Sequence, residues 1–339
     1  MAAEIEEQPQ ILERILTDTL AEIRDVAATI ARSNCRFVLF AARGTSDHAA
    51  LYAKYLVETL LQLPAGLVSP STTTIYDARP DLRGVMYLAV SQSGGSPDLI
   101  EAVTRARECG ALTLAVTNAP QSALVECAEL SLAIGAGPES AVAATKSYTA
   151  ELLALYLLVA GLAGRPTDDV TPLPEQARRL LARGHEVAEL AIRYRFVDQL
   201  VVTARGYNYP TAREAALKLM ETSYLVAHAF SGADLLHGPL AMIDRGFPVI
   251  ALSPAGPGSG ALLPVLEQLR RRGADTLVLG DLPALKLATV GMQLPDDVPE
   301  ALSPILTILP VQQFAWHLAI ARGLDPDRPR GLQKVTQTR

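Results

Sequence analysis

The chain has 339 residues, which is enough for two domains that each bury a core of their own. Apolar residues make up 49% and charged residues 19%, a composition that excludes a disordered chain and fits an α/β protein. The net charge of -6, with no dense run of Lys or Arg, argues against nucleic-acid binding.

We expect a soluble, cytoplasmic protein that does not enter a membrane. The N-terminus lacks the basic and apolar regions of a signal peptide, and the longest apolar stretch, near 152–164, is too short to span a bilayer. Three cysteines, Cys35, Cys109 and Cys127, are too few and too irregularly spaced for a disulfide framework or a zinc site. We interpret them as reduced thiols.

The first half of the chain alternates strands with helices. Residues 5–33 have the apolar spacing of a helix. Short apolar runs then predict strands at 37–41, 85–90, 112–116 and 130–134. The intervening segments predict helices at 47–63, from Pro97 onward and at 145–162. This order is typical of a parallel sheet covered on both faces.

The second half repeats the same plan after a Pro- and Gly-containing linker near 164–174. Strands are predicted at 200–204, 249–253 and 276–280, with a helix through Met220 and a final helix at 304–322. Arg43-Gly44 and Arg205-Gly206 follow equivalent strands of the two halves. The predicted fold class is therefore α/β, with two tandem domains that each contain a flavodoxin- or Rossmann-like parallel sheet flanked by helices.

The predicted domain organisation has four parts. A helical segment (1–34) precedes the first domain (35–165), the second domain follows (166–325), and a tail (326–339) ends the chain.

A loop rich in hydroxyl groups directly follows the strand at 85–90 and precedes Pro97, a residue suited to the first turn of a helix. Such a loop offers backbone N–H groups, a helix N-terminus and serine hydroxyls to one anion. An isolated loop of this kind is equally compatible with a turn in which Ser96 caps the helix. A second hydroxyl-rich loop at a neighbouring strand end favours a phosphate site instead. The predicted contacts are Thr45, Ser46, Ser91, Gln92, Ser93 and Ser96.

Lys218 and Glu221 are three residues apart, so both point to one side of their predicted helix. An exposed ion pair is the simplest interpretation of such a pair. The helix is unusually apolar, however, and apolar surroundings raise the proton affinity of a carboxylate, as an enolisation base requires. His237 lies in a loop fixed by Gly238 and Pro239, where it is a possible proton shuttle.

The other histidines do not indicate a metal site. His185 and His317 lie on predicted helices, His48 begins a helix, and His228 is expected to end the helix of Glu221. No pair has metal-ligand spacing with nearby carboxylates, so we expect no catalytic metal and no cofactor.

Six sequence blocks occur in the order typical of one family. RGTSDH, SQSGGSPD, AVAATKS, ALKLMETSY, LLHGPLAMID and DRPRGLQKVTQ resemble the sugar-isomerase domains of glucosamine-6-phosphate synthase. The resemblance runs from about residue 35 to the C-terminus. RGTSDHAALYAKY and GLQKVTQT are most similar to the type II glucosamine-6-phosphate deaminases.

This resemblance implies roles for individual residues. Glu221 would move a proton between C1 and C2 with help from Lys218, and His237 would open the sugar ring. Lys334, in the tail, would close over the sugar and meet its carbonyl, although a tail lysine can also be simply a solvated cation. Val142 would contact the sugar through its backbone, and the six hydroxyl-loop residues would hold the phosphate.

Three positions depart from the synthase pattern. Arg43 replaces a small residue and Leu236 replaces a lysine, both in agreement with the deaminases. Ala144 replaces a serine that contacts the sugar, so one hydroxyl contact is missing.

The synthases carry a glutaminase domain headed by an N-terminal cysteine, whereas this sequence begins Met1-Ala2 with a short helix before the first domain. We therefore expect a deaminase that converts glucosamine 6-phosphate to fructose 6-phosphate and ammonia. The alternatives are an aminotransferase using free ammonia or a separate glutaminase, a fructosamine-phosphate deglycase, and a sugar-phosphate sensor without enzyme activity. The resemblance also implies a homodimer in which His237 of one subunit completes its neighbour's site.

Overall fold

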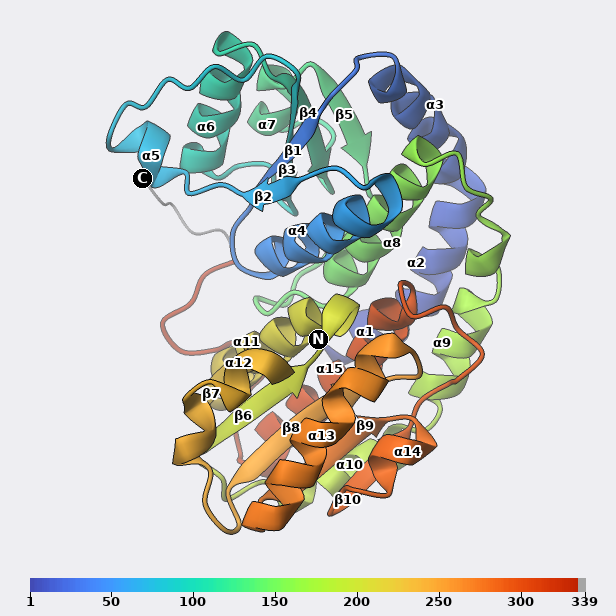
Figure 1. The fold of residues 1–339 in the computed structure, drawn as a ribbon, viewed down its shortest axis with the longest axis vertical. Helices are drawn as coiled ribbons and strands as arrows, with labels where there is room; N and C mark the ends of the chain where they lie inside the picture. Colours follow the sequence, from blue (N-terminus) through green and yellow to red (C-terminus); the bar gives the residue numbers. More distant parts are fainter. Residues whose placement is uncertain (335–339) are drawn as a thin grey trace. The chain divides into compact units, whose positions relative to one another are not determined.

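The computed structural model describes residues 1–334, which form two compact units (Figure 1). The first unit contains residues 10–140 and 146–171 together with residues 333 and 334. The second unit contains residues 1–9, 141–145 and 172–332. Three short segments, residues 1–9, 141–145 and 333–334, therefore join the unit that is not their neighbour in sequence. Residues 335–339, the end of the predicted tail, lie outside the described residues.

The elements up to residue 171 are, in chain order, α1 (Ala2–Glu6), α2 (Gln8–Arg14), the π-helix η1 (Ile15–Thr19), α3 (Leu20–Ala31), β1 (Phe37–Ala41), α4 (Thr45–Leu56), the π-helix η2 (Val57–Leu61), β2 (Ala65–Leu67), α5 (Ser71–Thr74), β3 (Val85–Ser91), α6 (Pro97–Glu108), β4 (Leu112–Thr117), α7 (Ala123–Cys127), β5 (Leu130–Ala133), α8 (Lys146–Leu162) and the 3₁₀ turn η3 (Asp168–Val170).

The elements after residue 171 are α9 (Leu173–Leu181), α10 (Gly184–Arg193), β6 (Gln199–Ala204), the 3₁₀ turn η4 (Gly206–Asn208), α11 (Tyr209–Ser223), β7 (Val226–Ser231), α12 (Gly232–Leu236), the 3₁₀ turn η5 (Pro239–Met242), β8 (Pro248–Ser253), α13 (Pro257–Arg272), β9 (Asp275–Gly280), α14 (Leu282–Leu285), β10 (Val290–Gln293) and α15 (Ser303–Ala321).

Each unit contains one parallel five-stranded sheet, which confirms the predicted α/β class. The strand order is β2-β1-β3-β4-β5 in the first unit and β7-β6-β8-β9-β10 in the second. The two orders correspond strand by strand, so β1 is equivalent to β6 and β3 to β8. The internal repeat predicted from the two Arg-Gly loops is therefore a repeat of topology.

Helices cover both faces of the first sheet. Alternate strand residues, including Tyr87 and Ala89, pack with α6 and α7 into one buried cluster. The residues between them face the other way, where α3, α4 and α8 pack. Both faces are apolar because helices, not water, lie against them, as expected for a parallel sheet.

The second sheet is built in the same way. Val201, Val249, Ala251 and Val278 pack against apolar residues of α12, α13 and α14. Helices α11 and α15 pack against each other, and α11 also contacts β6 and β8. The strand ends of β6 and β8 are thereby held at one edge, beside the N-terminus of α13.

Three strands and one helix end were not anticipated from the sequence. The strands β2, β7 and β10 are edge strands with weak apolar runs, and β2 and β10 are also short. The prediction that His228 ends the helix of Glu221 is wrong, because α11 ends at Ser223 and His228 lies in β7. Tyr224 stops the helix by adopting a left-handed conformation, with φ 57°.

Helix α15 is long and apolar enough to cross a membrane, with a mean hydropathy of 1.2 over its most apolar window. In the described part of the chain it is the one helix with this property. Of that window, 78% is buried inside the protein, which is typical of a core helix.

The close pairing of β8 with β9 predicts that substituting Gly280 lowers the stability of the protein. Gly280 pairs with Ser253, and an added Cβ would lie 2.4 Å from the Ser253 carbonyl oxygen, a backbone atom that cannot move cheaply. We expect Gly280→Ala to destabilise the protein by about 1–3 kcal/mol. The urea midpoint of unfolding measures this.

Gly260→Ala is the matched control, because Gly260 lies within α13 and its added Cβ would meet nothing within 4 Å. Its midpoint should stay the same or rise, since alanine favours a helix by up to about 1 kcal/mol over glycine. Equal midpoints for the two variants would contradict the packing described for Gly280.

Candidate active site residues

The six predicted phosphate contacts lie on two loops at the carboxyl edge of the first sheet. Strand β1 ends at Ala41 and Thr45 begins α4, while β3 ends at Ser91 and its loop leads to α6. Because β1 and β3 are paired neighbours, the two loops emerge side by side. Gly44 and Gly94 have φ of 56° and 59°, which lets both backbones turn sharply.

Hydroxyl groups shape the loop after β3. The Gly94 N–H donates to Ser91 Oγ at 3.2 Å, and the Gly95 N–H donates to Ser93 Oγ at 3.3 Å. Ser96 is the N-cap residue of α6, and its side chain makes no capping hydrogen bond to the helix. The interpretation of Ser96 as a side-chain helix cap is therefore wrong.

Ser46, in the first turn of α4, is hydrogen-bonded to a carboxylate that was not predicted from the sequence. Its hydroxyl donates to Glu151 Oε1 at 2.8 Å, and Glu151 is fully buried within the long apolar helix α8. An acidic residue in the middle of an apolar helix was the available sequence signal. The contact fixes the rotamer of Ser46 at the loop.

Arg43 and Asp98 join the outer ends of the same two loops. Arg43 Nη2 lies 2.6 Å from Asp98 Oδ2 and Nε donates to the same oxygen at 2.7 Å. Asp98 is buried, while nearly half of the Arg43 side chain is exposed. The Asp98 Oδ1 atom also accepts the Leu99 N–H in the first turn of α6. Arg43, the departure from the synthase pattern, is therefore an ion-paired part of this edge.

The predicted acid–base pair is part of a buried cluster of three charges in α11. Lys218 Nζ lies 2.6 Å from Glu221 Oε2 and 3.3 Å from Glu214 Oε1. Lys218 and Glu214 are completely buried, and Glu221 is 20% exposed. The simple interpretation as an exposed ion pair is therefore wrong. Glu214 was missed, although its position four residues before Lys218 places it on the same helix face.

The charge of Lys218 is stabilised by its neighbours. Burial alone lowers the pKa of a lysine, but here the negative charges of Glu214 and Glu221 outweigh that effect and raise the Lys218 pKa above its ordinary value. Lys218 is thus a buried ammonium that donates a hydrogen bond to Glu221, the one partly exposed carboxylate of the cluster.

His237 and Val142 also belong to the second unit. His237 follows α12 directly and is exposed, and Gly238 after it has φ 125°, which turns the chain away. The segment 141–145, which includes Val142, is fixed at both ends. The Ala141 N–H donates to Glu4 Oε1 at 3.2 Å, and Gln312 Nε2 donates to the Thr145 carbonyl at 3.1 Å.

Lys334 is not a solvated tail cation. Its Nζ lies 3.0 Å from Oε2 of Glu139, whose side chain is fully buried. Glu139 also accepts the N–H and the hydroxyl of Ser147 at the start of α8, at 3.1 and 2.8 Å. Upstream, Arg330 is held by Tyr224, because its N–H donates to the Tyr224 hydroxyl at 2.9 Å and its guanidinium lies over the ring.

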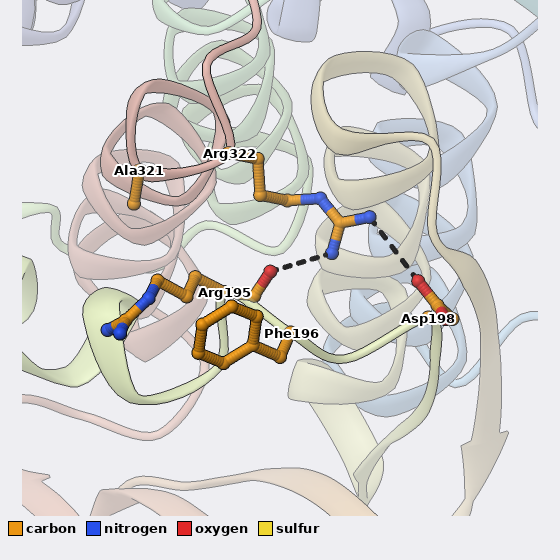
Figure 2. Close-up of a pocket in the computed structure, with 5 residues that line it drawn as sticks. All are labelled: Arg195, Phe196, Asp198, Ala321 and Arg322. Atoms are coloured by element: carbon orange, nitrogen blue, oxygen red, sulfur yellow. Dashed lines mark hydrogen bonds and ion pairs between the residues drawn. The ribbon is translucent and has the colours of Figure 1, made fainter.

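The predicted residues thus divide between the two units. The first unit holds the six hydroxyl-loop residues and Lys334, and the second holds Lys218, Glu221, His237 and Val142. Within residues 1–334, no group of three or more His, Cys, Asp or Glu side chains is arranged to hold a metal ion. Figure 2 shows a separate hollow in the second unit, lined by Arg195, Phe196, Asp198, Ala321 and Arg322. None of the predicted site residues lines it.

Two units with the same parallel-sheet topology define a tandem α/β protein, and comparison with known families agrees. A model described as the SIS domain matches residues 33–161 and 195–322, one match for each sheet. The chain belongs to the SIS domain family.

Named relatives cover the whole chain. It is 37% identical over 340 residues to a glutamine–fructose-6-phosphate aminotransferase (isomerizing) of Methanothermobacter thermautotrophicus, a match that covers 98% of this chain and 56% of the relative. A relative of the same name from Thermococcus kodakarensis is 36% identical and is covered to 57%. The chain therefore spans little more than half the length of these curated relatives.

Solved structures show the same architecture. The C-terminal domain of glucosamine-fructose-6-phosphate aminotransferase from Francisella tularensis has a TM-score of 0.85 and 27% identity, covering 96% of this chain and 97% of that chain. Glucosamine-6-phosphate deaminase from Thermotoga maritima has a TM-score of 0.82 and 22% identity, covering 99% of both chains. The second likeness is one of fold.

The buried cluster in α11 predicts a large cost for losing its lysine. Lys218→Met removes the ammonium that lies 3.3 Å from the buried Glu214 and 2.6 Å from Glu221, which should cost about 3–5 kcal/mol of stability. The double variant Lys218→Met/Glu214→Gln should recover most of this loss, since the buried carboxylate that faced Lys218 is then a neutral amide. Urea unfolding midpoints test both, and equal midpoints for the single and double variants would contradict the charge argument.

The same cluster predicts a pH dependence. Because the Lys218 pKa is raised in the folded protein, its stabilising contribution is complete below the ordinary lysine value of 10.5 and is lost only as pH rises through the higher folded pKa. The stability difference between wild type and Lys218→Met/Glu214→Gln, in which residue 214 no longer titrates, should therefore be constant from about pH 7 to 9. A difference that falls steadily across this range would contradict the direction of the shift.

Proposed function

We propose that this protein is a glucosamine-6-phosphate deaminase that produces fructose 6-phosphate and ammonia. The observation that carries the proposal is the α11 cluster, in which a buried ammonium holds Glu221 at 2.6 Å while Glu221 stays partly open to solvent. An aldose–ketose proton transfer needs such a positioned carboxylate beside a cation. Family membership and the names of the relatives support a phosphorylated sugar as substrate.

The hydroxyl loops of the first unit would hold the phosphate group. Ser91 and Ser93 accept loop N–H groups, Ser46 is fixed by Glu151, and the N-terminus of α6 follows. A dianion is favoured there by backbone amides and the helix dipole. Phosphate binding would fix the far end of the sugar, so that binding energy is used to position C1 and C2.

Proton transfer would begin after ring opening, the step we assign to His237. Glu221 would take the proton from C2 and return it to C1, while O1 gains a proton and the nitrogen on C2 loses one. The aldehyde carbon thereby becomes CH₂OH and C2 carries an imine. Water then adds to the imine, the C2–N bond breaks, and the products are the C2 ketone and ammonia. Lys218 would stabilise the negative charge that develops on oxygen, and Lys334, whose Nζ lies 3.0 Å from Glu139, would meet the sugar carbonyl.

Several further features belong to this proposal. We propose a cytoplasmic homodimer with shared active sites, acting without a cofactor, a metal, nucleic acid or a membrane. The deamination direction uses only the sugar phosphate and water, so the residues of this chain would suffice for it. Arg43 and Leu236, the two departures from the synthase pattern that agree with the deaminases, support this direction.

The aminotransferase direction is the second candidate, favoured by the names of relatives up to 37% identical. It would need ammonia or a glutaminase to supply nitrogen. A fructosamine-phosphate deglycase and a non-catalytic sugar-phosphate sensor are the remaining alternatives. The sensor is disfavoured because binding alone does not require a buried Lys218 between two carboxylates.

The first test is ammonia release from glucosamine 6-phosphate by the purified protein, with neither glutamine nor added metal. We expect ammonia and fructose 6-phosphate to form in equal amounts, measured by enzymatic assays of both products. Release of an amino acid from a fructosamine phosphate instead would identify the deglycase. Tight binding without turnover would contradict the deaminase and favour the sensor, and product formation only with glutamine and a partner would favour the aminotransferase.

The role of Glu221 is tested by Glu221→Gln, which keeps the size of the side chain and removes the base. We expect kcat to fall by about 10²–10⁴, the usual loss when a general base is removed, with KM changed much less. Glu267→Gln, an exposed substitution on α13, is the control and should leave both parameters unchanged. A kcat for Glu221→Gln within about tenfold of wild type would contradict the assignment.

A further inference from the structure

The second unit contains a copy of the backbone that forms the phosphate loops in the first. Gly206 follows β6 as Gly44 follows β1, and their φ angles are 57° and 56°. Ser253 ends β8 as Ser91 ends β3. Pro257 begins the 16-residue helix α13 as Pro97 begins α6. Both loops of the pair are thus present twice, at equivalent strand ends.

The loop after β8 lacks the serines that the loop after β3 carries between its strand and its helix. Four steps separate Ser253 from Pro257, against six between Ser91 and Pro97, and the shorter loop reads Pro-Ala-Gly. The N-cap residue is Gly256 where the first unit has Ser96. The Ser253 hydroxyl contacts Ser259 at 2.9 Å, and Ser259 donates to Asp281 at 2.8 Å. These hydroxyls are therefore used within the fold.

A carboxylate lies at the N-terminus of α13. Glu300 Oε1 accepts the N–H of Gly258, the second residue of α13, at 2.9 Å. A Cβ added to Gly258 would lie 2.3 Å from the same oxygen, and one added to Gly256 would lie 2.8 Å from the Glu300 side chain. A Cβ on Gly206, on the other loop, would lie 3.6 Å from it. Glu300 thus sits between the two loops.

The electrostatic potential at the N-terminus of α13 favours an anion. The N-terminus of a long helix carries partial positive charge and offers N–H groups without partners in the helix. Burial raises the pKa of Glu300, and the Gly258 N–H opposes that rise. Among residues 1–334, Glu300 forms no ion pair with a lysine or arginine, and its half-buried carboxylate accepts the Gly258 N–H, as a phosphate oxygen would.

We propose that Glu300 is a built-in occupant of a second, duplicated anion site, and that its carboxylate replaces the phosphate of a sugar phosphate or free inorganic phosphate. The second unit then binds no phosphate while Glu300 is in place, and one phosphate binds per chain. This count rests on the proposed function, which assigns the phosphate to the first unit. The site itself rests only on the geometry of the second unit.

Calorimetric titration of the full chain with inorganic phosphate tests the proposal. Wild type should bind one phosphate per chain, and Glu300→Ala should bind two, because truncation frees the helix N-terminus and the space between the loops. Glu300→Ser is a second opening variant, in case the alanine protein fails to fold. Glu300→Gln is the matched control, since its amide fills the same space and its oxygen can still accept the Gly258 N–H. It should bind one.

Each combination of results decides between the two hypotheses. A gain of one phosphate in both opening variants and none in Glu300→Gln supports the duplicated site, whatever wild type binds. No gain in either folded opening variant overturns the duplicated site and leaves the proposed function intact if wild type binds one phosphate. Wild type that binds none, with a gain on opening, supports the duplicated site and contradicts the phosphate assignment in the first unit.

Discussion

Parallel pairing of adjacent strands is the constraint on which the chemistry of this protein depends. Neighbouring parallel strands end at the same edge of a sheet, so the loops after β1 and β3 emerge together, and so do the loops after β6 and β8. Each edge also receives the N-terminus of the helix that follows the second strand. In both units the backbone therefore provides loop N–H groups and a helix N-terminus at this edge, which attract anions whatever the side chains are.

The side chains then use these edges differently in the two units. The first unit adds neutral hydroxyls, and the ion pair of Arg43 with buried Asp98 ties its two loops together. In the second unit the loop between β8 and α13 is shorter, and Glu300 accepts the N–H of Gly258 there. The acid–base residues that we propose, Lys218 and Glu221, lie instead on α11, the helix after β6. Under the proposed function, phosphate binding and proton transfer are therefore assigned to different units of one repeated topology.

Buried charges occur in this protein with partners, as the cost of burying an isolated charge requires. Lys218 is enclosed by Glu214 and Glu221, and the buried Glu139 meets Lys334 and Ser147. These clusters are worth little as net stability, because desolvation opposes the Coulomb attraction. They are well suited to fixing functional groups in one geometry, which a catalytic site needs.

The sequence by itself determined the α/β class, the repeat and the loops at strand ends, because apolar runs, glycine turns and helix spacing are local signals. It also placed Lys218 and Glu221 on one helix face. Only the tertiary structure revealed Glu139, Glu151 and Glu300 as partners, since each contacts residues distant in sequence or in another element. Only the structure showed that Lys218 and Glu221 do not form an exposed ion pair on the surface. The exposure of a side chain depends on how α11 packs against other elements, and the local sequence pattern does not specify that packing.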